Sequence, residues 1–178
     1  MSRLAFPHWL AIVFVIFFAA LAVEPVSRTV WIAEVIPVVI VFGLLAGTYS
    51  RFRFSNTAYA LMAFWMFWHT IGGHYTFANV PFDWFSDLVG SERNHFDRIG
   101  HLSVGFYAFA AAEWLLRKGH CRYWLANLFA LLLIMGIAAA YEIIEWWYAV
   151  LEGGDAGIEF LGSQGDIWDA QKDMLADT

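Results

Sequence analysis

Long apolar runs, separated by short polar stretches, constrain this chain more than any other feature. A helix needs roughly 20 apolar residues to cross about 30 Å of hydrocarbon, and the sequence supplies several such runs. Hydrophobic residues make up 61% of the 178 residues and charged residues only 15%, with a mean hydropathy of +0.58. This composition is too apolar for a soluble domain of that length, and it predicts a polytopic membrane protein.

We predict an all-α transmembrane bundle of five spans. They cover residues 7–23, 30–49, 57–72, 97–116 and 123–150. Proline at position 37 predicts a kink in the second span, and the pair Gly72-Gly73 is expected to break the third. The fifth span is roughly 42 Å long at 1.5 Å per residue, so it should tilt or protrude. The first run also resembles a secretory signal, but the retained Met1 favours a true span.

The charges divide unevenly between the two sides of this bundle. The side that holds the N-terminus, called the basic side, carries six lysines and arginines and one carboxylate, Glu113. The opposite side, called the acidic side, carries four lysines and arginines and 15 of the 16 carboxylates. The positive-inside rule therefore places the N-terminus in the cytoplasm. The chain shows no repeat or linker, so we expect one domain over residues 1–178, with loops 73–96 and 151–165 on the extracytoplasmic, acidic side.

Four of the six histidines also fall on the acidic side. His69 lies about one turn inside the end of the third span, with His74 just beyond it, and His95 and His101 flank the start of the fourth. Asp97 and His101 are four residues apart, so they share one helical face. Small residues continue that face, which predicts that the pair points into the bundle.

Carboxylates recur on two further segments at this depth. Glu142 and Glu145 are three residues apart on the fifth span, where they are costly unless protonation, a cation or a basic partner neutralises them. After Gly165, the acids Asp166, Asp169 and Asp173 form a stripe along one helical face, and Asp166 is expected to cap that helix.

Imidazoles and carboxylates without thiolates suit zinc, manganese or non-haem iron. The single cysteine excludes a cysteine-based zinc site, the two Glu-x-x-His motifs of di-iron carboxylate bundles are absent, and no His-Glu-x-x-His motif occurs. The candidate metal ligands are His69, Asp97, His101, Glu142, Glu145, Asp166, Asp169 and Asp173. The candidate catalytic groups are Asp97, Glu142 and Glu145, and the other polar residues of the site are His74, Arg93, His95 and Arg98.

Each candidate also has a purely structural interpretation. Asp97 could cap the fourth helix, and His101 could be a hydrogen-bonded core histidine. Arg93 or Arg98 could pair with Glu142 or Glu145 and leave no need for a metal. The acidic stripe near the end of the chain could be an ordinary solvated helix face. The functional interpretation rests on three or four segments meeting at one depth.

Several of these segments resemble YjdF-type bacterial inner-membrane proteins. The resemblance is carried by residues 69–75, 93–101, 141–146 and above all 165–174, and it covers nearly the whole chain. It implies a polytopic inner-membrane protein of unassigned activity. Members of this family usually continue into a further hydrophobic helix, which would make six spans, whereas a chain ending at Thr178 would have five. The last six residues are also faintly similar to VanZ-like membrane proteins.

Three functions follow from these observations. The first is a metal-dependent enzyme that acts at the outer leaflet on a lipid or another small molecule near the membrane. The second is a proton or cation transporter, although the basic-side halves of the spans offer few polar residues. The third is an accessory or assembly subunit whose polar cluster only holds helices together. The lipid bilayer is the expected partner, a protein partner stays open, and nucleic acid is excluded because the chain has no basic stripe.

Overall fold

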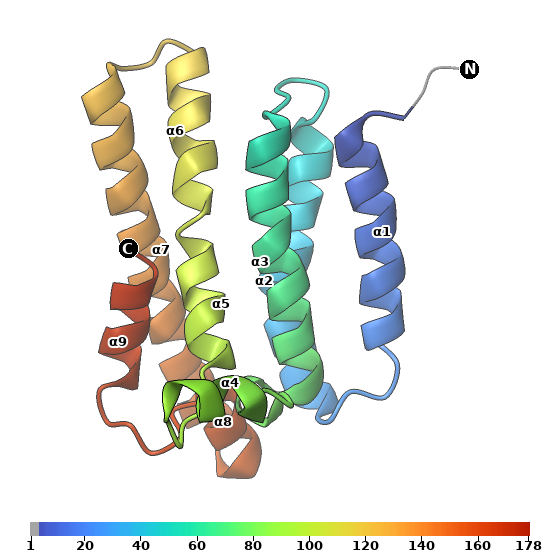
Figure 1. The fold of residues 1–178 in the computed structure, drawn as a ribbon, viewed down its shortest axis with the longest axis vertical. Helices are drawn as coiled ribbons and strands as arrows, with labels where there is room; N and C mark the ends of the chain where they lie inside the picture. The colour runs from blue at the N-terminus through green and yellow to red at the C-terminus, as the bar shows by residue number, and fades with distance from the viewer. Residues whose placement is uncertain (1–3) are drawn as a thin grey trace.

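The computed structural model describes residues 4–178, without the side chains of Ala156 and Glu159, and all regular structure in this part of the chain is helical. The longer helices run along the long axis, with α5 and α6 stacked end to end (Figure 1): α1 (Phe6–Leu21), α2 (Arg28–Thr48), α3 (Asn56–Tyr75), α5 (Phe96–Val104), α6 (Tyr107–Arg117) and α7 (Tyr123–Glu152). Shorter elements gather at the acidic end: η1 (Phe77–Asn79), α4 (Asp83–Val89) and α8 (Gly154–Leu161). The predicted all-α bundle is confirmed.

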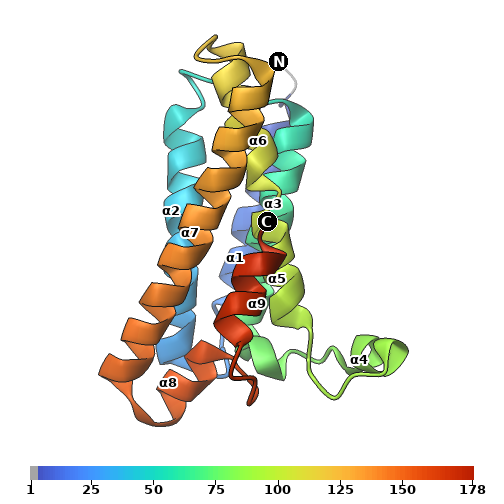
Figure 2. The ribbon, with the colours of Figure 1, turned by 90° about the vertical axis from the view of Figure 1, so that its left-hand side faces the viewer.

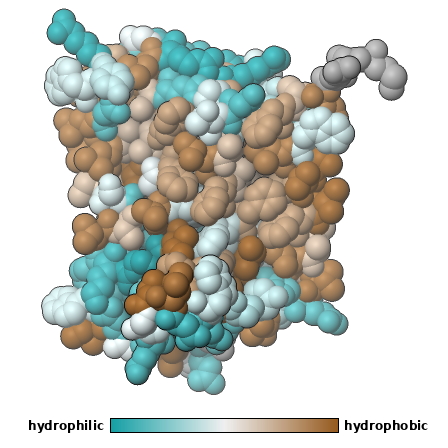
Figure 3. All heavy atoms as spheres, viewed as in Figure 1, coloured by the Kyte–Doolittle hydropathy of each residue, from teal (hydrophilic) through white to brown (hydrophobic). Residues whose placement is uncertain are grey.

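Three segments of the described chain are long and apolar enough to cross a membrane: α2, the α5–α6 segment over Phe96–Arg117, and α7. The apolar helix α1 is shorter, and α3 runs beside them at the centre of the bundle, in contact with α1, α2, α5 and α6. Figure 3 shows hydrophobic residues across the middle of one face and hydrophilic residues toward its two ends. This is the surface expected of a membrane bundle, while the count of five spans stays a prediction.

The glycine pair in α3 does not break the helix, so that prediction is wrong. The helix continues through Gly72 and Gly73 to Tyr75. A methyl group at Gly72 would collide with the ring of Phe77, and one at Gly73 would lie 3.0 Å from Cβ of Glu34. The absence of a side chain at these two glycines therefore allows Phe77 and Glu34 to pack closely against α3, and the helix continues through both positions.

The fourth predicted span is interrupted where we expected one continuous helix. Helix α5 ends at Val104 and α6 begins at Tyr107, with Gly105 and Phe106 in the turn between them. A methyl group at Gly105 would lie 2.6 Å from the backbone oxygen of Asp177. The interruption therefore occurs where the end of the chain packs directly against the bundle.

The final helix, α9 (Asp169–Ala176), turns back along α5 and α7 (Figure 2). Its acids are buried, with Asp169 6% exposed and Asp173 3% exposed, whereas Leu175 is 74% exposed. The residues before it, Ile167 and Trp168, are 84% and 60% exposed. The interpretation of the acidic stripe as a solvated face is therefore wrong: Asp169 and Asp173 face the bundle, and the outward side of α9 is mixed, with Leu175 exposed beside Gln171 and Lys172.

Candidate metal centre

His101 is surrounded by carboxylates from three helices. Its Nε2 atom lies 3.6 Å from Oδ1 of Asp97, 3.9 Å from Oε1 of Glu142 and 3.9 Å from Oδ1 of Asp173. Its Nδ1 atom lies 3.3 Å from Oδ2 of Asp177. We call these five residues the histidine–acid centre. One potential ligand atom from each of Asp97, His101 and Asp173 lies within 4.8 Å of the other two, which is close enough for one ion.

Local sequence explains how these side chains meet. Asp97 and His101 lie one turn apart on α5, as their spacing predicts, and Glu142 faces them from α7. Gly105 lets the end of α9 approach, which brings Asp173 and Asp177 to the other side of the imidazole. The centre therefore depends on helices that are far apart along the chain.

Three buried carboxylate oxygens of this centre accept no hydrogen bond from the described residues: Oε1 of Glu142, Oδ1 of Asp173 and Oδ1 of Asp177. Oδ1 of Asp173 is paired with Arg98 at 2.9 Å, which leaves Oδ1 of Asp177 and Oε1 of Glu142, 3.9 Å from Nε2 of His101, as the two poorly satisfied atoms. A buried carboxylate oxygen without a donor or a cation is costly. Carboxylate oxygens beside an imidazole form a donor set that fits a divalent ion such as zinc or manganese, and such an ion would satisfy both atoms.

The two arginines of α5 and its preceding loop bind the start of α9. Nη2 of Arg93 and Nη2 of Arg98 lie 2.6 and 2.7 Å from Oδ1 of Asp169, and Nη1 of Arg98 lies 2.9 Å from Oδ1 of Asp173. The alternative in which these arginines neutralise Glu142 or Glu145 is therefore wrong for the described structure. Their contacts hold α9 in place and leave the α7 carboxylates without an arginine partner among the described residues, so that Glu142 faces only the imidazole of His101, at 3.9 Å.

His69 lies in a second, separate pair. Its Nε2 atom is 3.1 Å from Oε2 of Glu34, a residue that is only 2% exposed, and the hydroxyl of Tyr141 donates to the same oxygen at 3.1 Å. Glu34 was not among the candidate residues. Its signal is a lone carboxylate in the apolar run of α2, a feature that marks functional positions in membrane helices.

A cavity of about 170 Å³ connects the two groups. Its polar end is formed by His69, Asp97, His101, Glu145 and Asp177, and its apolar wall by Pro37, Val41, Val104, Ile134, Ile137 and Ala138. Glu145 is 9% exposed, and the described residues make no hydrogen bond or ion pair with its carboxylate. The cavity therefore offers acids at one end and hydrocarbon-like walls at the other, an arrangement that matches an amphiphilic molecule.

The remaining candidates lie outside the histidine–acid centre. Nδ1 of His74 is 2.7 Å from the carbonyl oxygen of Leu21, and Nε2 of His95 is 2.8 Å from Oγ of Ser91. Asp166 does not cap α9, which begins three residues later at Asp169, so that prediction is wrong. Its carboxylate instead accepts hydrogen bonds from the Trp168 backbone at 3.1 Å and from Lys172 at 2.6 Å.

The acids of the C-terminal segment differ in their protonation behaviour. Burial raises the pKa of Asp173 to about 8 and also raises the pKa of Asp177. The hydrogen bond from Lys172 lowers the pKa of exposed Asp166. At neutral pH Asp173 therefore favours its protonated form unless a nearby cation replaces the proton, and burial shifts Asp177 in the same direction.

Acids outnumber arginines throughout this region. Seven buried or largely buried carboxylates, from Glu34, Asp97, Glu142, Glu145, Asp169, Asp173 and Asp177, face two guanidinium groups, from Arg93 and Arg98. Protonating both His69 and His101 would still leave acids in excess. An excess of buried negative charge favours protons or a bound cation at this site.

The fold and this centre define a helical membrane protein with a buried cluster of acids and histidines near one end of its bundle. Residues 6–178 match the family described as predicted membrane protein (DUF2238), and the chain belongs to that family. It is similar to the inner membrane protein YjdF of Escherichia coli strain K12, with 37% identity over 152 residues, which cover 84% of this chain and 72% of that relative. No solved structure matches the chain significantly. The resemblance noted from sequence is confirmed.

Proposed function

We propose that this protein is a metal-dependent membrane enzyme that acts on a lipid or another amphiphilic substrate. The observation that carries the proposal is the convergence of Asp97, His101 and Asp173 within 4.8 Å. Beside them lie buried oxygens of Glu142 and Asp177 that accept no hydrogen bond from the described residues. Zinc, manganese or iron(II) suits this ligand set. The adjoining cavity would receive the substrate, with its polar group toward the acids.

The residues divide into distinct roles. The histidine–acid centre would hold the ion, which would polarise a substrate oxygen or activate water. Glu145 lines the same cavity and would transfer protons, because its carboxylate lacks a partner in the described structure. Asp169 is held by both arginines, so we assign it to positioning α9, with Asp166 at the rim beside Lys172.

The proposed membrane location rests on the relative and on the distribution of basic residues. The YjdF relative is an inner-membrane protein, and we place this chain in the bacterial inner membrane with its N-terminus in the cytoplasm, as the distribution of basic residues predicts. The centre would then face the periplasmic leaflet. The substrate would enter from that leaflet.

Metal analysis of the purified full chain tests the proposal. We expect about one divalent ion per chain in the wild type, and at least a roughly tenfold loss of affinity in His101→Ala and in Glu142→Gln. His120→Ala is the matched control, because His120 lies at the basic end of the bundle beside Trp114 and outside the centre. Helical content and the melting temperature verify that each variant folds.

Two outcomes would overturn this proposal. The absence of stoichiometric metal from folded wild type, with no effect of added zinc, manganese or iron(II), would favour an accessory protein with a structural cluster. Proton or cation flux in proteoliposomes that is lost in Glu142→Gln would favour a transporter. Transport lacks support at the basic end, where Glu113 is already bound to Ser55 and Arg117.

A further inference from the structure

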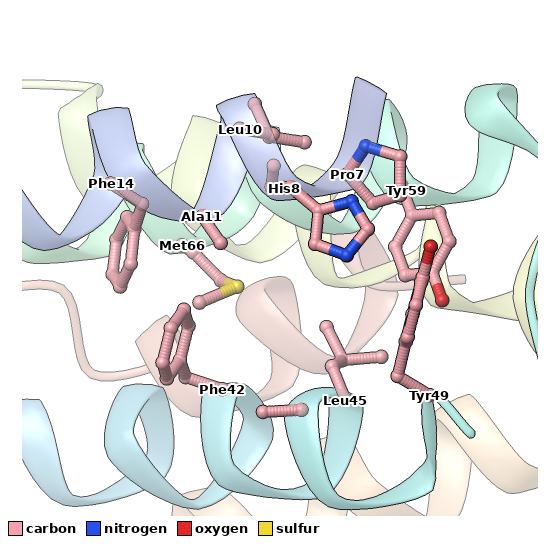
Figure 4. A pocket seen from close by; sticks show the side chains of 12 residues that line it. Pro7, His8, Leu10, Ala11, Phe14, Phe42, Leu45, Tyr49, Tyr59 and Met66 are labelled. Atoms are coloured by element: carbon pink, nitrogen blue, oxygen red, sulfur yellow. The ribbon is translucent and has the colours of Figure 1, made fainter. Parts of the chain in front are cut away.

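A second cavity lies at the basic end of the bundle, between α1, α2 and α3, and has a volume of about 250 Å³. Figure 4 shows side chains of α1 and α2 facing one another across it. The end of the bundle contributes His8, Tyr49 and Tyr59, and the deeper part is lined by Phe14, Phe42 and Met66. This cavity is far along the helices from the histidine–acid centre and shares no lining residue with the first cavity.

The polarity of the cavity changes with depth. The guanidinium carbon of Arg53, an exposed residue, lies 5.0 Å from the ring centroid of Tyr49, and the rings of His8 and Tyr49 meet edge to face at 5.0 Å. Farther in, the rings of Phe14 and Phe42 are 5.6 Å apart. A cation, then hydroxyl groups, then hydrocarbon is the order in which a phospholipid presents its phosphate, ester groups and acyl chain.

The hydroxyl group of Tyr59 gives independent support for a ligand. Tyr59 is 6% exposed, and its buried hydroxyl lies near the Phe54 backbone but makes no well-formed hydrogen bond with the described residues. Buried hydroxyl groups nearly always have a partner, because an unsatisfied one is costly. Tyr59 lies about one turn, roughly 5 Å, inside the start of α3, which suits contact with an ester carbonyl in the interfacial layer.

We propose that this cavity binds one acyl chain of an anionic phospholipid from the leaflet on the basic side. The Tyr59 hydroxyl donates a hydrogen bond to an ester carbonyl, and the phosphate group lies near Arg53. The charge of this end agrees, because it also carries Arg51, Lys118 and Arg122 and its single acid, Glu113, is paired with Arg117. The volume suits a segment of one chain and is too small for a whole lipid.

Native mass spectrometry of the delipidated full chain, titrated with phosphatidylglycerol or with phosphatidylcholine of the same acyl chains, tests the site. We expect the wild type to bind phosphatidylglycerol roughly fivefold more tightly, and Arg53→Gln to abolish that preference. Tyr59→Phe should weaken binding of both lipids by roughly threefold to tenfold, because it removes one hydrogen bond and keeps the ring.

A volume test separates the cavity from general lipid contact. Ala11→Leu places a larger side chain in the cavity, whereas Ala19→Leu makes the same change at an exposed position of the same helix. We expect a roughly tenfold loss of lipid binding in Ala11→Leu and none in Ala19→Leu. Equal binding in the two folded variants would overturn the cavity, and equal affinity of the wild type for both lipids would overturn the anionic head group. Metal content is unaffected in either case.

Discussion

The two ends of the bundle differ in how their shielded acids are neutralised: Glu113 at the basic end is partly buried, and Glu142 at the acidic end is buried. At the basic end, Glu113 accepts hydrogen bonds from the backbone and hydroxyl of Ser55 at 2.8 and 2.7 Å and pairs with Arg117 at 2.5 Å. At the acidic end, the buried Oε1 atom of Glu142 accepts no hydrogen bond from the described residues, and Nε2 of His101 lies 3.9 Å away. The comparison teaches that balance of charge, more than burial, distinguishes a polar contact that joins helices from one that needs a ligand.

The largest effect on stability is expected from Gly105→Val. A side chain at this position collides with the Asp177 backbone, so α9 must move away from α5, at a cost of about 1–3 kcal/mol in unfolding free energy. The variant should also lose metal binding, because two acids of the centre leave with α9. Gly43→Val is the control, since no atom lies within 4 Å of an added Cβ there. Equal stability of the two variants would contradict the close packing of α9.

At the basic end, Glu113→Gln should lower the unfolding free energy by about 1.5–2 kcal/mol. The substitution weakens hydrogen bonds to a charged acceptor and removes the partner of Arg117. Thermal unfolding in detergent measures the change. Metal affinity should stay at the wild-type value, and a loss of metal here would contradict the structural role of this pair.

At the acidic end, Glu142→Gln should raise the unfolding free energy when metal is absent, the opposite of the effect expected for Glu113→Gln. This buried carboxylate accepts no hydrogen bond at Oε1 from the described residues and makes only a long contact with His101. Replacing it with a neutral amide removes repulsion from the neighbouring acids, so the metal-free variant should be more stable by about 1 kcal/mol. The comparison is made after chelation, by the same unfolding measurement as for Glu113→Gln. If both substitutions destabilise the protein equally, the distinction between the two ends fails.

The smallest effect is expected from Lys172→Ala. Its ammonium group lies 2.6 Å from Oδ2 of Asp166, but the lysine side chain is 54% exposed. Exposed ion pairs contribute little to stability because solvent screens them, so the melting temperature and the metal content should hardly change. A large loss of metal would show that the rim beside α9 belongs to the centre.

Local patterns were sufficient to predict part of the centre. The spacing of Asp97 and His101 places both on one helical face, and this contact is present at 3.6 Å. The all-α bundle likewise follows from hydropathy, because each apolar run is long enough to signal a helix by itself. These features depend on residues close together in the sequence.

Features that depend on tertiary packing could not be predicted in this way. The acidic stripe of α9 has the same sequence pattern whether it faces water or a protein interior, and only its contacts with α5 and α7 decide between them. Glu34 of α2 pairs with His69 of α3, and no rule based on spacing along the sequence predicts this contact. Gly72 was expected to end a helix because glycine is a poor helix former, but its packing against Phe77 outweighs that preference.

The orientation of α9 has a consequence for biogenesis. Before it docks, this segment is unfavourable both in water and in lipid. In water the apolar side chains of Ile167, Trp168 and Leu175 are exposed to solvent, and in lipid the carboxylates of Asp169 and Asp173 are costly to bury. Its partners Arg93, Arg98 and His101 are synthesised much earlier and must already be in position to receive it. Docking of α9 therefore depends on α5 and the loop before it, because these elements supply the arginines and the histidine that receive its acids.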